Sequence, residues 1–237
     1  MIKGLTDIGL LRELNEDSYF FADEGERFVI AVSDGMGGHN AGDVASKLAV
    51  TAVKEFAENN NIYADSEKKI RIALMEANER IFAHSCQNKE TRGMGATIVV
   101  AVGDGENVVI GNIGDSRAYI ADKESIQQIT EDHSYVNELV KSGMITEEEA
   151  RTHPKKNEIL KAVGIGRDVF PDIFNIKLSE DEKLLLCTDG LTNMLTDDEI
   201  LDMLNSSQNS EEILKSLIDA ANKNGGADNI TAVLLKK

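Results

Sequence analysis

Four aspartates stand at the ends of apolar runs, where their carboxylates could meet and do chemistry together. Asp34 follows VIAVS, Asp115 follows VVIGNIG, Asp189 follows LLLCT, and Asp228 stands just before ITAVLL. Asp-Gly and Gly-Asp are ordinary turn dipeptides, so any one of these residues alone indicates only a turn. Because the pattern recurs along the whole chain, we expect the four carboxylates to converge in one cleft.

Such a cleft needs protons or cations to balance its charge. Two carboxylates about 4 Å apart repel by about 4 kcal/mol at an effective dielectric constant of about 20. The candidate ligands are hard oxygens, and neither histidine nor cysteine occurs in a zinc-type spacing. This donor set predicts Mg²⁺ or Mn²⁺ rather than zinc or copper. Three carboxylates, two such ions and the nearby Arg12 would leave a charge of about +2, which matches a phosphomonoester dianion.

Several segments must position these carboxylates. Helical periodicity or capping predicts helices at 43–58, from Ser66, after Thr146, after Thr196, and from Ser210 to Gly225. Strand-like runs occur at 19–22, 28–32, 97–102, 108–112, 117–121, 173–178, 184–188 and 230–235. The strands come in groups and the helices in pairs, which favours an α+β fold with antiparallel sheets over a doubly wound parallel sheet.

Length and composition favour one large domain over residues 1–237. The segment from His133 to Asp172, which holds both prolines and several charged residues, is expected to form a surface insertion or flap. The net charge of -17 disfavours nucleic acids and anionic membranes as partners. Cys86 and Cys187 stand in apolar contexts and are interpreted as buried thiols in a reducing compartment. No signal peptide or membrane span is apparent, so we expect a cytoplasmic protein.

The motifs RELNED, SDGMGG, GDSRAY, EDHS, TDGL and DNIT occur in this order along the chain. Each motif alone is weak, but the ordered set resembles the metal-dependent protein Ser/Thr phosphatases of the PP2C type, in their compact bacterial form. The similarity spans residues 1–237. It implies a four-layer α-β-β-α sandwich, in which two antiparallel β-sheets are flanked by pairs of α-helices and the metal cleft lies at one edge.

The resemblance also implies a set of metal ligands. Asp34 would bridge two core ions of Mn²⁺ or Mg²⁺, and Gly35 would offer its backbone carbonyl to one of them. Asp189 and Asp228 would hold the other core ion. Asp115 would contribute, together with Asp189, to a weaker third site.

The roles of the remaining site residues are implied in the same way. Arg12 would grip the phosphate, and Glu16 would bind the waters of the metal ions. Eukaryotic relatives carry a histidine where this chain has Met36, so the general acid is open between His39 and a metal-bound water. His133, in EDHS, is expected to have a structural or flap-anchoring role.

The implied activity is hydrolysis of phosphoserine and phosphothreonine in proteins by a metal-activated water, without a covalent enzyme intermediate. The expected partners are a bacterial Ser/Thr protein kinase and its phosphorylated substrates, and the expected state is a monomer. Two alternatives remain at this point. A two-metal phosphodiesterase or nuclease would share the ion chemistry, although the net charge of -17 argues against a polyanionic substrate. An inactive phosphoprotein-binding relative would be expected to have lost metal aspartates.

Overall fold

Two antiparallel β-sheets form the centre of the molecule. The computed structural model describes residues 1–37, 41–87, 89–206 and 209–237. One sheet, called sheet A, has the strand order β1 (Ile2–Asp7), β11 (Ile230–Lys236), β10 (Lys183–Cys187), β7 (Arg117–Ala121) and β8 (Ile126–Gln128). The other, sheet B, has the order β2 (Asp17–Asp23), β3 (Arg27–Met36), β5 (Ile98–Asp104), β6 (Asn107–Ile113) and β9 (Asp172–Lys177), and the short β4 (Gly95–Ala96) also pairs with β3.

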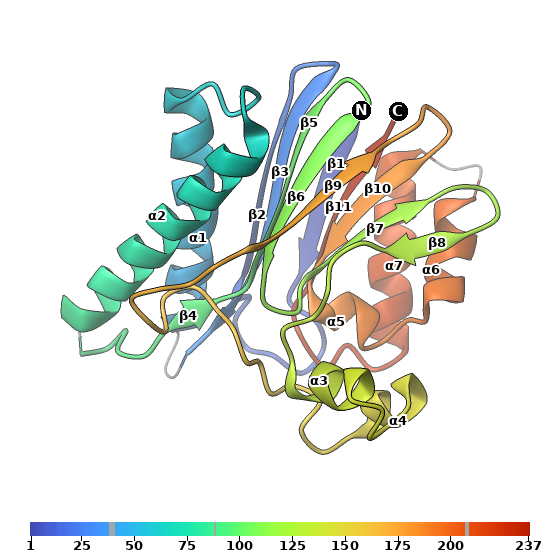
Figure 1. Cartoon of the computed structure of the whole chain (residues 1–237). Helices are drawn as coiled ribbons and strands as arrows, with labels where there is room; N and C mark the ends of the chain where they lie inside the picture. The colour runs from blue at the N-terminus through green and yellow to red at the C-terminus, as the bar shows by residue number, and fades with distance from the viewer. Residues whose placement is uncertain (38–40, 88, 207–208) are drawn as a thin grey trace.

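Helices cover the outer face of each sheet (Figure 1). Sheet B is covered by α1 (Ala41–Asn59) and α2 (Ser66–Gln87). Sheet A is covered by α5 (Asp189–Thr192), α6 (Asp197–Leu204) and α7 (Ser210–Lys223). The helices α3 (Tyr135–Lys141) and α4 (Glu147–Thr152) stand apart at one end of the sandwich. The predicted α+β fold with four layers is therefore confirmed.

The strand sequences explain why the two sheets stack between helices. In β3, Val29 and Ala31 point into the core shared with α1 and α2, whereas Ile30 and Val32 point into the core between the sheets. Side chains on a strand alternate between its faces, and here both faces are buried. A continuous apolar run such as VIAV is therefore what a central strand of this sandwich requires.

Several details differ from the sequence-based expectations, and the short β4, β8 and α5 were not predicted. The first strand, β1, has the sequence IKGLTD and was not predicted, because it lacks an apolar run. It pairs with β11 from Ile2↔Leu235 to Asp7↔Ile230, so its partner strand defines it. The prediction that Cys86 is buried is wrong, because this residue lies near the end of α2 and is exposed, whereas Cys187 is buried in β10.

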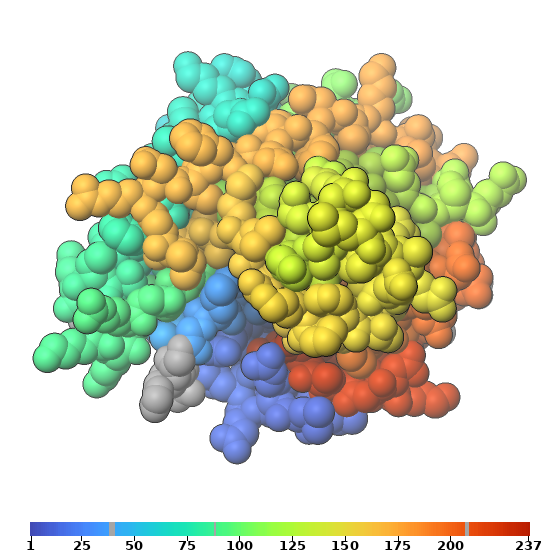
Figure 2. Space-filling model, turned by 60° about the horizontal axis from the view of Figure 1, so that its bottom comes forward, coloured from blue at the N-terminus to red at the C-terminus, as the bar shows by residue number. Residues whose placement is uncertain are grey.

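The segment 133–172 forms a lobe that carries α3 and α4 and stands out over the rest of the surface in Figure 2. The part from His133 to Leu160 is closed at its base, because the Tyr135 N–H donates to the Glu158 carbonyl and the Leu160 N–H donates to the His133 carbonyl. We call this lobe the flap. In the described part of the chain, no helix combines the length and apolar character needed to cross a bilayer.

Candidate metal and phosphate site

Asp34 lies near the end of β3, where the strand leaves the core. It is the direct partner of Asp17 in the antiparallel pair β2–β3. The backbone of Asp34 is fixed on its other side by Thr97, whose Oγ1 accepts from the Asp34 N–H at 2.9 Å and whose N–H donates to the Asp34 carbonyl at 2.8 Å. Two carboxylates are thus held side by side on neighbouring strands.

Gly35 is a glycine because other backbone atoms approach it closely. A Cβ atom at Gly35 would lie 1.9 Å from the Gly42 carbonyl oxygen and 2.7 Å from the Glu16 carbonyl oxygen. The Gly35 N–H donates to that same Glu16 carbonyl at 3.1 Å. Gly42, at the start of α1, donates its N–H to the Glu16 carboxylate at 3.1 Å. The two glycines therefore let β3, α1 and the segment before β2 meet around Glu16.

Asp189 and Asp228 meet through a second close backbone approach. Asp189 begins α5 directly after β10, and its Oδ2 accepts from the Asn193 amide at 2.8 Å. A Cβ atom at Gly190 would lie 2.0 Å from the Asn229 carbonyl oxygen and 3.3 Å from the Asp228 Cβ. Only a glycine fits there. The absence of a side chain at Gly190 allows the start of α5 to approach the segment that carries Asp228.

Asp115 and Asp17 complete the group of carboxylates. Asp115 follows β6 and is only 6% exposed. Asp17 opens β2, is equally buried, and accepts at Oδ2 from the Thr188 hydroxyl at 2.9 Å. Asp17 belongs to the motif RELNED, and no role was predicted for it. Its position just before the apolar run SYFFA is the same signal that Asp228 shows before β11, and it could have identified the residue.

Burial and mutual repulsion dominate the electrostatics of this group. Burial, followed by repulsion from Asp17 and Asp189, raises the pKa of Asp34 well above its usual value. Burial and then repulsion from neighbouring carboxylates likewise raise the pKa values of Asp115 and Asp189. Burial raises the pKa of Asp17 to about 7, despite hydrogen bonds from two threonines. These side chains cannot all be ionised at neutral pH unless cations share the site.

The oxygen atoms of the group fit a divalent cation. Oδ1 of Asp17, Asp115 and Asp189 is buried and has no hydrogen-bond partner among the described residues. Within that same part of the chain, no three His, Cys, Asp or Glu side chains are arranged to hold an ion by themselves. Mg²⁺ usually keeps several waters and takes only one or two carboxylates, so the unpartnered oxygens suit ions that remain partly hydrated.

Arg12 and Glu16 lie at the edge of the carboxylate group. Nη2 of Arg12 donates to Oδ2 of Asp228 at 2.8 Å, and the Arg12 side chain is 45% exposed. Glu16 is held by the Gly42 N–H, and burial raises the pKa of its carboxyl group. The structure thus brings Arg12 to the site, but as the partner of Asp228.

The histidines considered as functional lie elsewhere or outside the description. His39 falls among residues 38–40, outside the described part of the chain. His133 accepts at Nδ1 from the Gly114 N–H at 2.9 Å, so Nε2 carries the proton and donates to Asp172 at 3.1 Å. This arrangement ties the start of the flap to β9 and agrees with the anchoring role expected for His133.

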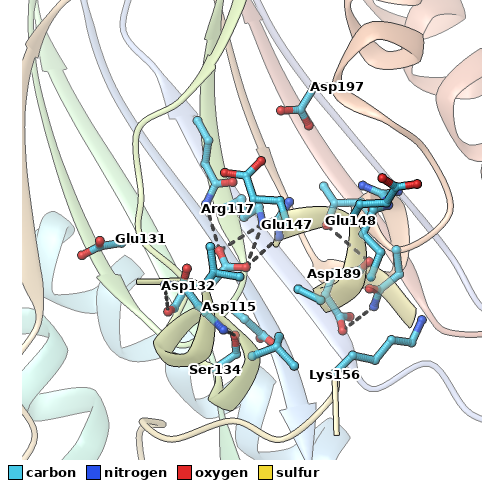
Figure 3. Close-up of a pocket in the computed structure, with 18 residues that line it drawn as sticks. Asp115, Arg117, Glu131, Asp132, Ser134, Glu147, Glu148, Lys156, Asp189 and Asp197 are labelled. Carbon is cyan, nitrogen blue, oxygen red and sulfur yellow. Dashed lines mark hydrogen bonds and ion pairs between the residues drawn. The ribbon is translucent and has the colours of Figure 1, made fainter. Parts of the chain in front are cut away.

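A cavity of about 570 Å³ opens beside the carboxylates (Figure 3). It lies between the flap helices α3 and α4, the exposed edge of sheet A, and α5. Asp115 and Asp189 belong both to its wall and to the carboxylate group. The candidate site therefore continues from the ends of the strands to the inner surface of the flap.

Comparison with known proteins gives close matches over nearly the whole chain. Residues 12–235 match the family model for protein phosphatase 2C. The "Serine/threonine phosphatase stp" of Listeria welshimeri serovar 6b is 39% identical over 236 residues, which cover 98% of this chain and 94% of that protein. The crystal structure of the serine/threonine phosphatase Stp1 from Staphylococcus aureus matches with a TM-score of 0.95 and 38% identity, covering 100% of this chain and 94% of that one.

A further solved structure bears on the metal ions. The catalytic domain of the serine threonine protein phosphatase PstP, in complex with two manganese ions, matches with a TM-score of 0.88 and 34% identity, covering 99% of this chain and 96% of that one. The two sheets, their helix layers and the ordered aspartate motifs agree with these matches. This chain belongs to the protein phosphatase 2C family.

Proposed function

We propose that this protein hydrolyses phosphoserine and phosphothreonine monoesters in proteins, with two core Mn²⁺ or Mg²⁺ ions and a weaker third. The observation that carries the proposal is the set of buried, mutually repelling carboxylates of Asp34, Asp115 and Asp189, with the guanidinium of Arg12 at its edge. Such a site needs cations to be ionised, and with them it has the positive charge that a phosphate dianion requires.

In this proposal Asp34 and the Gly35 carbonyl hold one core ion, and Asp34, Asp189 and Asp228 hold the other. Asp115 and Asp189 take the third. When bound, the core ions supply a nucleophile derived from water at neutral pH and stabilise the charge that develops on the phosphate. The unpartnered Oδ1 atoms of Asp115 and Asp189 support these assignments, because a buried carboxylate oxygen without a partner is costly.

Arg12 is proposed to orient the phosphate. A guanidinium has five N–H donors, and among the described residues Arg12 uses only Nη2, toward Asp228. Its other donors remain available for two parallel hydrogen bonds to phosphate oxygens. Glu16, whose carboxylate is held by the Gly42 N–H, is proposed to orient waters of the ions rather than to contact the substrate.

The proposed substrates are phosphorylated cytoplasmic proteins, including a Ser/Thr protein kinase of the same cell. The net charge of -17 supports protein substrates over nucleic acids, because a polyanion would be repelled at long range. The same repulsion argues against the phosphodiesterase alternative, whose substrates would include polyanionic nucleic acids.

The decisive experiment measures phosphate release from a phosphothreonine peptide with Mn²⁺, with excess chelator, and with Mn²⁺ restored. We expect turnover only when Mn²⁺ is present. A chromogenic monoester and the matching diester, assayed in parallel, separate the two enzyme alternatives. Turnover in excess chelator would refute metal dependence, preferential cleavage of the diester would favour the phosphodiesterase, and inactivity on every substrate would favour a binding protein.

A further inference from the structure

The cavity between the flap and the carboxylate group has more negative charge than metal binding requires. Its wall includes seven carboxylates and only three basic side chains. Two of the carboxylates, Asp115 and Asp189, belong to the proposed metal site. Five others come from the segment just before the flap, from α4 and from the start of α6, as Figure 3 shows: Glu131, Asp132, Glu147, Glu148 and Asp197.

Most of the basic charge in the wall is already engaged. Arg117 is paired with Asp132, with Nη2 at 2.7 Å and Nε at 3.0 Å from the carboxylate. Arg151 donates to the carbonyls of Thr192 and Leu195, at 3.3 and 3.1 Å, at the end of α5. Of the three basic residues, only Arg117 makes an ion pair within the described part of the chain, and Lys156 makes neither an ion pair nor a side-chain hydrogen bond there.

Two flap carboxylates, in contrast, line the cavity without an ion-pair partner among the described residues. Glu147 and Glu148 open α4 and are exposed. Neither forms an ion pair with another described residue, and their neighbour Glu149 closes the capping box with Thr146. The fold of α4 therefore depends on Glu149, while Glu147 and Glu148 remain free to meet a ligand.

A metal ion would fill only the floor of this cavity. Asp115, which is 6% exposed, lines the cavity and leaves its Oδ1 without a hydrogen-bond partner, so the cavity has a built cationic position at its base. The volume of about 570 Å³ lies within the range of sites that enclose whole organic groups. Room for a further cationic group therefore remains between the floor and α4.

We propose that this cavity receives a basic side chain of the phosphoprotein substrate, an arginine or lysine a few residues away from the phosphorylated serine or threonine. The proposal rests on the phosphatase function proposed above and names a class of substrate for it. Asp115 and Asp189 are shared by the cavity and the metal site, so a peptide with its phosphate at the ions has neighbouring residues within reach of α4. A long flexible cation fits an acidic cavity of this depth.

The test compares phosphothreonine peptides that differ only in one residue, arginine or glutamine, placed at each position from three before to three after the phosphothreonine. For the unchanged protein we expect kcat/KM to be about two- to fivefold higher with arginine at one or two positions, the size of a partly exposed ion pair. The preference should weaken as the salt concentration rises.

The matched variants are Glu147→Gln with Glu148→Gln, and, as a control, Glu79→Gln with Glu90→Gln. The control removes the same charge on and just after α2, in the helix layer over sheet B, and neither residue lines the cavity. The quantity compared is the ratio of kcat/KM for the arginine peptide to kcat/KM for the glutamine peptide. Because this ratio is taken separately for each protein, a variant's general change in activity cancels. We expect the ratio to fall toward one in the flap variant and to be unchanged in the control.

Two results would overturn the proposal while leaving the phosphatase function intact. One is equal hydrolysis of the arginine and glutamine peptides by the unchanged protein at every position. The other is an arginine preference that persists in the flap variant. Hydrolysis of the glutamine peptide with Mn²⁺ tests the proposed function separately, and its absence would refute that function together with the substrate class inferred from it.

Discussion

Replacing Gly35 by alanine would place a methyl group against the backbone that joins β3 to α1. The added Cβ would lie 1.9 Å from the Gly42 carbonyl oxygen, whereas ordinary van der Waals contacts begin at 3.4 Å. The two backbone segments would have to separate by about 1.5 Å, and neither is a flexible side chain that could move aside. The change therefore acts on the strand that carries Asp34.

The expected magnitudes follow from this displacement. Overpacking of this kind lowers the free energy of unfolding by about 1–3 kcal/mol. For a chain of 237 residues this corresponds to a fall in Tm of about 2–12 °C. A misplacement of about 1 Å at a reacting centre costs about 100-fold in rate, so we expect at least that loss in kcat/KM for a phosphothreonine peptide with Mn²⁺.

The matched control is Gly166→Ala, because the nearest atom to a Cβ at Gly166 is the Asp168 carbonyl oxygen at 3.9 Å. This variant should retain the parent's activity and Tm. Assays run well below the Tm of Gly35→Ala separate loss of activity from loss of fold. Parental activity and stability in Gly35→Ala would refute the argument that close backbone approach, rather than flexibility, is the reason for this glycine.

Three further predictions concern charge at the site and at the flap. Asp189→Asn should lower kcat/KM about 100-fold or more and reduce the Mn²⁺-induced rise in Tm, and a full Mn²⁺ shift in the variant would contradict its assignment as a ligand. Arg12→Ala should lower kcat/KM by about 10- to 100-fold and Arg12→Lys by less, since lysine keeps the charge but not the paired donors; equal losses would argue against phosphate orientation. Burial lowers the pKa of His133, so its neutral form stabilises the fold fully above pH of about 6.5 and this stability is lost as the pH falls through the lower folded value. The fall in Tm from pH 7.5 to pH 5 should therefore be smaller in His133→Gln, and an unchanged fall would show that His133 does not titrate as expected.

The strands and the main carboxylates could be predicted because both depend on local patterns. An apolar run ends where the strand leaves the core, and an aspartate at that point marks the boundary between core and solvent. Asp34, Asp115 and Asp189 all follow this rule. Asp228 marks the same kind of boundary at the other end of a strand, because it stands just before β11. The continuous apolar run from Val29 to Val32 likewise indicates a strand that is buried on both faces, as the structure shows.

Contacts between distant segments could not be predicted in this way. The pair formed by Arg12 and Asp228 joins positions 216 residues apart, and the sequence analysis assigned the two residues to different ligands. The strand β1 depends on β11 for its conformation, because its own sequence has little apolar character. The burial of Cys86 was judged from its neighbours, but on a helix the face decides exposure, and this residue faces outward.

The site and the core place opposite demands on the same polypeptide. Asp17 and Asp34 face each other on the adjacent strands β2 and β3, and Asp189 starts a helix that is packed against β11. Each carboxylate loses hydration on folding, and their mutual repulsion adds to that cost. The apolar layers on both faces of each sheet must offset this cost in the metal-free protein, which explains why the apolar runs of β3, β6 and β10 continue to two residues before the acid. If the proposed ions bind there, they would remove the repulsion, and the carboxylates that weaken the metal-free fold would make its stability depend on the metal.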